Sequence, residues 1–196
     1  GKDPAPYITT TVMTKLVDSD NQNSGVYRTL VRDDHHVVVN MNPRRGGNDQ
    51  CETWWSQGKA APVAWVIGAD PAYQLASVAT MPTGMQEMEV AGGLMGEPIE
   101  LVKCVTNDIL VPANAEIIIE GEIMPGERYK EGPFGENLGF MCEISEKPVA
   151  RITAITRRKD AIYYGMTSQM PPSESTTLQS QSTAGLISKI LRHDLG

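Results

Sequence analysis

The segment Tyr7-Ile-Thr-Thr-Thr-Val-Met-Thr14 has the composition and the pattern of a β-strand. It is rich in β-branched residues, and the polar Thr9 and Thr11 give the alternation that is typical of a strand with one face in water. We therefore expect a half-buried strand here, with its apolar face against a core.

Strand-like segments recur along the chain. The other candidates are residues 26–31, 36–41, 63–67, 99–105, 116–122, 149–156 and 162–167, with turn-forming residues between them. Two short helices are expected as well, one at about residues 49–56 and one with Asp70 as N-cap and Pro71 as its first residue. This order predicts a mainly β fold with short helices (α+β), arranged as a barrel and not as a doubly wound parallel sheet.

Composition narrows the class of protein. The 196 residues are 40 % hydrophobic and 21 % charged, which is ordinary for a globular domain with a core. The formal net charge is −7 and no long basic run occurs, so we expect no nucleic-acid partner. No apolar run approaches the roughly 20 residues that span a bilayer, so we expect no membrane partner. Cys51, Cys104 and Cys142 are widely spaced and form no CxxC pair, which is typical of reduced thiols in a cytoplasmic protein.

The composition changes near residue 171. Residues 7–170 hold all the strand-like segments, and we expect them to form one domain. The polar stretch 171–182 reads as a linker, and residues 183–192 read as the beginning of a helix. We therefore expect residues 171–196 to be a linker and the start of a helix that leads to a C-terminal domain outside this sequence.

The segment Glu131-Gly-Pro-Phe-Gly-Glu136 places two carboxylates in one short turn. Proline fixes its own φ, and the glycines permit backbone angles that other residues avoid, so the two acids need not share an environment. Two carboxyl groups in different environments can serve as one acid and one base. A surface loop with two solvated glutamates is the alternative, and the spacing leaves both open. The chain has no GxGxxG and no GxxxxGK[ST] motif, which excludes the usual dinucleotide and P-loop sites.

Six segments together resemble a known family. They are Asn23-Ser-Gly-Val-Tyr-Arg28, Arg45-Gly-Gly47, Gly68-Ala-Asp-Pro71, Gly92-Gly-Leu-Met-Gly-Glu97, Val102-Lys-Cys104 and Glu131-Gly-Pro-Phe-Gly-Glu136. In this order they resemble the central domain of the UbiD-like decarboxylases, which use prenylated flavin mononucleotide (prenylated FMN). The resemblance covers about residues 7–172. It implies a split β-barrel that binds the flavin, between an N-terminal α/β segment and a C-terminal domain that makes homo-oligomers.

The resemblance also implies a catalytic trio, which is Arg28, Glu131 and Glu136. Arg28 lies in an apolar strand, where a buried guanidinium would need a partner, and Glu131 could pair with it at two points. An arginine on a wet strand face is the alternative that the residues leave open. Glu136 would be the proton donor, with Phe134 and Phe140 as apolar neighbours.

The family pattern assigns the ligand-binding residues too. Contacts to the flavin would come from Val26, Tyr27, Arg28, Asn40, Met41, Asn42, Arg45, Gly46, Thr80 and Met81. Asn23 and Glu87 would bind Mn²⁺ or Mg²⁺ at the flavin phosphate, since such ions prefer oxygen ligands, and the pattern also allows K⁺. Without the resemblance, a turn asparagine and a solvated glutamate are the simpler readings. Many relatives have histidine where this chain has Arg44, which cannot ligate a metal because it stays protonated.

The implied function is that of a carboxy-lyase. It is reversible non-oxidative decarboxylation of an aromatic or α,β-unsaturated carboxylic acid, with a flavin prenyltransferase as the partner that supplies the cofactor. A cofactor is required because no side chain can accept the electron pair that is left when carbon dioxide departs. The alternatives are a split-barrel module for electron transfer or flavin reduction, or an inactive isolated domain. Electron transfer would not need the trio.

Overall fold

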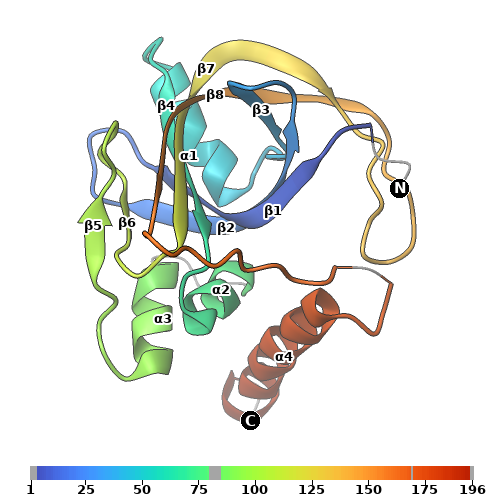
Figure 1. Cartoon of the computed structure of the whole chain (residues 1–196). Helices are drawn as coiled ribbons and strands as arrows, with labels where there is room; N and C mark the ends of the chain where they lie inside the picture. The colour runs from blue at the N-terminus through green and yellow to red at the C-terminus, as the bar shows by residue number, and fades with distance from the viewer. Residues whose placement is uncertain (1–3, 80–84, 169, 195–196) are drawn as a thin grey trace.

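Six antiparallel strands close into a barrel (Figure 1) in the order β1-β2-β3-β8-β7-β4. The computed structural model describes residues 4–79, 85–168 and 170–194. The barrel strands are β1 (Tyr7–Lys15), β2 (Gln22–Val31), β3 (His36–Val39), β4 (Ala61–Ile67), β7 (Ile117–Glu131) and β8 (Ser145–Arg157). The predicted fold class, mainly β with short helices around a barrel, is confirmed.

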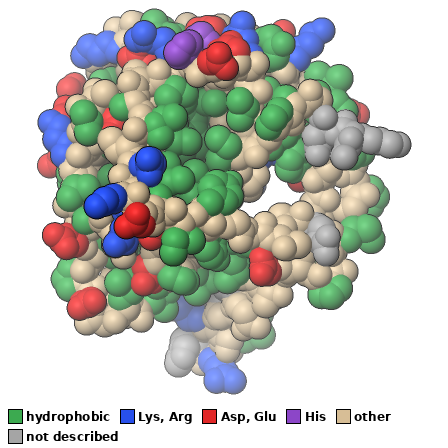
Figure 2. Space-filling model, viewed as in Figure 1, with side chains coloured by type: hydrophobic (Ala, Val, Ile, Leu, Met, Phe, Trp, Pro, Cys, Tyr) green, Lys and Arg blue, Asp and Glu red, His purple; other side chains and the backbone are tan. Residues whose placement is uncertain are grey.

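Helices and a small second sheet surround the barrel. They are α1 (Gly46–Trp55), α2 (Pro71–Val78), α3 (Glu87–Met95), the hairpin of β5 (Leu101–Lys103) and β6 (Leu110–Pro112), and α4 (Glu174–Lys189) with the π-helical turn η1 (Ile190–Asp194). In Figure 1, α2 and α3 lie side by side below the barrel, and α4 stands beyond them at the C-terminal end. Hydrophobic side chains gather in the middle of the face that Figure 2 shows. No helix in the described part of the chain is long and apolar enough to cross a membrane.

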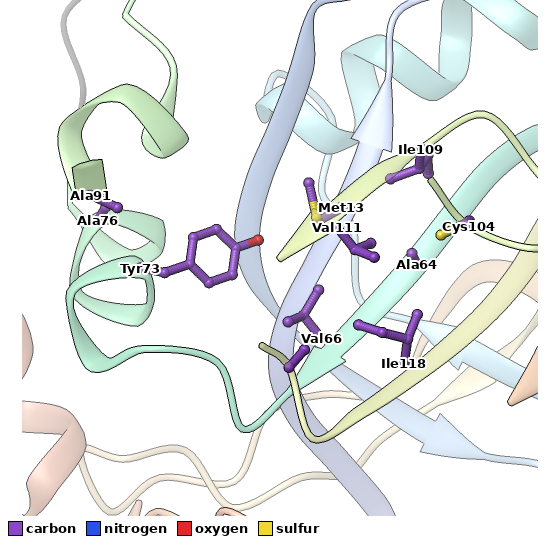
Figure 3. Packing of buried hydrophobic residues seen from close by; sticks show 11 residues of the cluster. Met13, Ala64, Val66, Tyr73, Ala76, Ala91, Cys104, Ile109, Val111 and Ile118 are labelled. Atoms are coloured by element: carbon purple, nitrogen blue, oxygen red, sulfur yellow. The ribbon is translucent and has the colours of Figure 1, made fainter. Parts of the chain in front are cut away.

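Neighbouring residues on one strand pack into two different hydrophobic clusters, because successive side chains point to opposite faces of the strand. Val12 and Trp65 belong to the cluster inside the barrel, which α1 covers. Met13 and Val66, the next residues along β1 and β4, belong to a cluster outside the barrel wall. Figure 3 shows this outer cluster, in which Tyr73 of α2 points its hydroxyl toward the strands. The barrel wall is therefore covered by apolar side chains on both faces where α2 and α3 pack.

The pair β7–β8 is longer than the rest of the barrel. Its register runs from Ile117 opposite Arg157 to Glu131 opposite Ser145, with an irregularity between Ile123 and Arg128. Such bulges bend a strand and increase its twist. The loop between the two strands consequently projects at the side of the barrel (Figure 1), and Glu131 lies where that loop begins.

Several elements differ from the sequence expectation. The strand predicted at residues 162–167 does not form. The segment pairs with none of the barrel strands, and the Ile162 N–H donates to the side chain of Glu116 instead. Helix α3 was not predicted, since Gly92 and Gly93 weaken helix propensity. A capping box, in which the side chains of Gln86 and Glu89 bind each other's backbone N–H, stabilises its start.

The polar stretch near the C-terminus is helical and not an extended linker. Helix α4 begins at Glu174, ahead of the predicted start at residue 183. Ser173 lies just before it, and its Oγ accepts the Thr176 N–H at 3.3 Å. Serine at such a position satisfies a backbone donor that the helix leaves unpaired. The side chain of Asn137, in the β7–β8 loop, donates to Gln179 of α4.

Candidate active site

Arg28 and Glu131 form a two-point ion pair. Arg28 lies on β2 opposite Thr9 of β1, and Glu131 is the last residue of β7. The Nε of Arg28 donates to Oε1 of Glu131 at 2.8 Å, and Nη2 donates to Oε2 at 2.9 Å. The side chains are 12 % and 0 % exposed, so the alternative of an arginine on a wet strand face is wrong. Burial lowers the pKa of Arg28, but the hydrogen bonds and charge of Glu131 outweigh it and raise that pKa above its usual value.

The second glutamate of the turn reaches the same guanidinium from another side. The φ of Gly132 is 96°, a left-handed value that glycine adopts without strain. Nη1 of Arg28 donates to Oε1 of Glu136. The Glu136 side chain is 40 % exposed, whereas that of Glu131 is fully buried. The two carboxylates thus share one cation but not one environment, as the spacing in the turn suggested.

Aromatic rings shield one side of the pair. The ring of Phe134 lies 4.9 Å from the Cζ of Arg28, and the ring of Tyr7 lies 4.6 Å from that of Phe134. A cation over an aromatic face is attracted by the ring quadrupole. Phe140 does not take part: its side chain is 72 % exposed. Phe140 is a neighbour of Glu136, since its carbonyl accepts the Glu136 N–H at 2.7 Å, but its exposed side chain offers little apolar cover.

Two residues at the site were missed in the sequence. The hydroxyl of Tyr7 donates to Oε1 of Glu131 at 3.1 Å, and the Sγ of Cys142 accepts from Nη2 of Arg28 at 3.1 Å. Burial, together with the charge and hydrogen bond of Glu131, raises the pKa of Tyr7 to about 12. Tyr7 therefore stays a neutral donor over the physiological range. Neither residue has a local sequence signal, because closure of the barrel brings Tyr7 to Glu131 and Arg28 to Cys142.

The half-buried Asn40 is one of the predicted flavin contacts. Asn40 follows β3, and its backbone N–H donates to the carbonyl of Arg28 at 3.0 Å. Its Oδ1 is buried and has no hydrogen-bond partner in the described part of the protein. Buried acceptors almost always have a donor, so an unpaired one beside Arg28 suits a ligand N–H. The half-buried Val26 and Tyr27 lie on the same strand as Arg28.

The other predicted flavin contacts differ in exposure. Met41 as a whole is only 2 % exposed and belongs to the cluster inside the barrel, so neither its side chain nor its backbone is open to a ligand in this structure. The exposed Asn42 accepts a hydrogen bond from Nζ of Lys147 at 2.6 Å. Thr80 and Met81 lie outside the described residues.

The N-terminus of α1 combines an exposed arginine with close backbone packing. Arg45 is the N-cap residue, and Gly46 and Gly47 open the helix. A Cβ on Gly46 would lie 2.1 Å from Oδ1 of Asn23, so a larger residue here would require Asn23 or the first turn of α1 to move. The Gly47 N–H donates to the hydroxyl of Tyr27 at 3.1 Å. The first turn of a helix binds anions through its unpaired N–H groups, which suits a phosphate here.

The two predicted metal ligands come from β2 and α3, which meet where Glu87 contacts Ser24. Asn23 is on β2, and Glu87, the first residue of α3, accepts the N–H of the adjacent Ser24 at 3.1 Å through Oε2. Burial raises the pKa of Glu87. No group of three or more His, Cys, Asp or Glu side chains suited to a metal occurs among the residues described. The two oxygen ligands fit a hard divalent ion whose remaining ligands are phosphate and water.

A family model matches residues 1–171 of the chain, that of the UbiD 3-octaprenyl-4-hydroxybenzoate carboxy-lyase Rift-related domain. The chain belongs to the UbiD family. The match covers the whole barrel, α1 to α3 and the turn that carries both glutamates, so the site described above lies in the region that defines this family domain.

Solved UbiD-class structures agree with the family match. HmfF from Pelotomaculum thermopropionicum in complex with FMN is 34 % identical, with a TM-score of 0.90 over 98 % of this chain and 43 % of that one. An evolved dimeric form of HmfF in complex with prFMN is 34 % identical, with a TM-score of 0.89 over 98 % and 44 %. The closed form of vanillic acid decarboxylase from Sedimentibacter hydroxybenzoicus is 29 % identical, with a TM-score of 0.85 over 91 % and 39 %. The chain thus spans about two-fifths of the length of these UbiD-class proteins.

Proposed function

We propose that this chain is the flavin-binding domain of a prenylated-FMN-dependent decarboxylase. Its substrate would be an aromatic or α,β-unsaturated carboxylic acid, and the reaction would be reversible and non-oxidative. The observation that carries the proposal is Arg28 held between the buried Glu131 and the half-exposed Glu136 in a UbiD-family chain. The FMN and prFMN in the related HmfF structures support the choice of cofactor.

The residues around Arg28 would hold the cofactor. The unpaired Asn40 Oδ1 and the half-buried Val26 and Tyr27 of β2 would contact the flavin, and Arg45 and Gly46 its phosphate. Asn23 and Glu87 would bind Mn²⁺ or Mg²⁺ beside that phosphate, and K⁺ remains a further prediction of the family pattern. When bound, the prenylated flavin supplies the electron sink that decarboxylation at an unsaturated carbon needs.

Arg28 would orient the carboxylate of the substrate. A guanidinium has five N–H donors. Nε and Nη2 are directed to Glu131 and Cys142, and Nη1 is directed to Glu136, which leaves one Nη1 proton without an acceptor among the described residues. That proton is the donor available to a bound acid. The buried pairing with Glu131 holds the guanidinium plane in one orientation.

Glu136 would carry the proton. Glu131 is unsuited to this task, because it is inaccessible and its oxygens accept from Arg28 and Tyr7. Glu136 binds Arg28 through Oε1 and is partly exposed, so Oε2 can take a proton from water and return it. In decarboxylation the proton would pass from Oε2 to the carbon that has lost carbon dioxide, and in carboxylation it would return to Oε2.

A flavin module for electron transfer is the second candidate. The barrel alone does not distinguish it, because one fold hosts many functions. The arginine between two carboxylates favours proton chemistry. Because the chain spans about two-fifths of its relatives, activity is proposed for the full-length protein, and a homo-oligomer in the cytoplasm remains a prediction.

The test uses full-length protein made together with a flavin prenyltransferase. Native mass spectrometry should detect prenylated FMN and a divalent metal ion in the protein. Carbon dioxide release is then measured over a panel of aromatic and α,β-unsaturated acids, and at least one acid should be consumed. Protein without bound flavin would contradict the cofactor assignment. Flavin-loaded protein that is inactive on the whole panel, but is reduced by a nicotinamide donor, would favour the electron-transfer candidate.

A further inference from the structure

Tyr7 binds both the ion pair and the turn. Its hydroxyl donates to Oε1 of Glu131 at 3.1 Å and accepts the backbone N–H of Gly132 at 3.3 Å. Its ring packs against that of Phe134, the residue at the centre of the turn. One side chain on β1 therefore holds a carboxylate of the trio and the peptide that follows it.

Cys142 has the same double role at the centre of the turn. Its Sγ accepts from Nη2 of Arg28 at 3.1 Å and from the backbone N–H of Phe134 at 3.2 Å. Its own N–H donates to the carbonyl of Phe134 at 2.9 Å. The sulfur therefore connects the arginine of the trio to the segment between the two glutamates.

From this geometry we infer that Tyr7 and Cys142 are positioning residues for the proposed reaction. Each binds one backbone N–H of the Glu131–Glu136 turn and one member of the Arg28–Glu131 pair. Together they set the distance between the ion pair and the turn that presents Glu136. The expected effect on kcat rests on the proposed function. The two hydrogen bonds that Tyr7 and Cys142 make to the backbone of the turn, which we call the clamp, can be measured without it.

Cys142 also governs which donor of Arg28 is left for a substrate. With the sulfur as acceptor, both Nη2 protons are engaged, and the remaining proton is on Nη1, next to Glu136. Loss of the sulfur would free an Nη2 proton that points to a different place. A bound carboxylate would then have two competing positions, and only the one near Nη1 would be adjacent to the proton donor.

The test compares Tyr7→Phe, Cys142→Ala and Cys142→Ser in the full-length protein. Tyr7→Phe keeps the ring and removes only the hydroxyl, and Cys142→Ser restores an acceptor at nearly the same place. Tyr129→Phe is the matched control, because Tyr129 is exposed and its ring packs on Arg32 and not on the site. The first readout is hydrogen exchange of the Gly132 and Phe134 amides, resolved by fragment mass spectrometry on protein without cofactor. The second is kcat and KM for carbon dioxide release.

We expect Tyr7→Phe to accelerate exchange at Gly132, and Cys142→Ala at Phe134, each about tenfold, which corresponds to one hydrogen bond. Cys142→Ser and Tyr129→Phe should stay close to the wild type. Both damaging variants should lower kcat about tenfold, and Cys142→Ala should also raise KM. Unchanged exchange in both variants, or faster exchange with unchanged kcat, overturns the inference. A flavin-loaded wild type that releases no carbon dioxide contradicts the proposed function instead, while the exchange data still test the clamp.

Discussion

Arg28 and Glu131 are 103 residues apart in the sequence and share two parallel hydrogen bonds of 2.8 and 2.9 Å. The pair joins β2 to the end of β7, strands that are not neighbours in the barrel. Because Glu131 is fully buried, each partner depends on the other for its charge to be tolerated. The pair is therefore at once a structural link and the centre of the candidate site.

Removing one partner should destabilise the protein strongly. Glu131→Ala leaves a buried guanidinium without its main partner, and we expect a loss of about 3–5 kcal/mol in the free energy of unfolding. The exposed Glu146→Ala, on the neighbouring strand, should change it by less than about 0.5 kcal/mol. Denaturant unfolding of the protein without cofactor measures both. A loss below about 1 kcal/mol for Glu131→Ala would show that solvent, and not Glu131, satisfies Arg28.

We expect Glu136→Gln to lower the activity of the protein without lowering its stability. The amide keeps an oxygen for Arg28 but cannot deliver a proton, so we expect kcat to fall about 10²- to 10⁴-fold. The side chain is partly exposed, so the melting temperature should stay within a few degrees of the wild type. Glu143→Gln, an exposed residue of the same loop, is the control and should be fully active. Carbon dioxide release at the wild-type rate from Glu136→Gln would remove this residue from the proton-donor role.

The Tyr7 hydroxyl should ionise only in strongly alkaline solution. Burial and the charge of Glu131 raise its pKa from 10.0 to about 12. Because the folded-state pKa is the higher one, the stability that Tyr7 contributes is present in full below pH 10 and is lost as pH rises toward 12. The difference between the tyrosinate absorbance titrations of wild type and Tyr7→Phe isolates this group. A difference curve centred near 10 would mean that Tyr7 does not contact Glu131 in solution.

Gly46→Ala should displace Asn23. A Cβ at this position would lie 2.1 Å from the Asn23 Oδ1, so the asparagine or the first turn of α1 must move. We expect Mn²⁺ affinity to fall at least about tenfold, as for loss of an oriented ligand. Gly93→Ala is the matched control: its Cβ would meet no atom within 4 Å, and alanine favours a helix. Titration with Mn²⁺, followed by electron paramagnetic resonance, measures the affinity. Equal affinities in Gly46→Ala and wild type would argue against Asn23 as a ligand.

Glu87→Gln should weaken metal binding without weakening the fold. Burial makes the charged carboxylate costly in the metal-free protein, so the neutral amide should leave the free energy of unfolding unchanged or slightly higher. Mn²⁺ should no longer raise the melting temperature, because a divalent ion binds an amide oxygen far less strongly than a carboxylate. The same loss is expected for wild type after treatment with a chelator. Undiminished stabilisation of Glu87→Gln by Mn²⁺ would place the metal elsewhere.

Local patterns predicted those parts of the fold whose signals are local. Strand-like composition predicted part of each of the six barrel strands but missed β6. The wet strand face expected at Thr9 and Thr11 is wrong at Thr11, which is only 3 % exposed. Asp70 followed by Pro71 placed the start of α2, where Asp70 Oδ1 accepts the Ala72 N–H at 2.8 Å. The pattern was misleading where tertiary contacts overrode it. Helix α3 forms in spite of two glycines, and the apolar residues 162–167 remain outside the ladder. Propensity is a weak guide wherever packing or a partner strand decides the outcome.

The same division applies to the site. The sequence alone sufficed to place Glu131 and Glu136 in one turn and to indicate that a buried Arg28 needs a carboxylate, since both follow from chain geometry and the cost of burying charge. Barrel closure decided that Glu131 is the inaccessible acid and Glu136 the accessible one. It also brought Tyr7 to the beginning of the turn and Arg28 to Cys142, which lies in the same loop as the turn. Contacts between residues more than a hundred positions apart give no periodic pattern in the sequence, because they depend on which strands close the barrel and in which register.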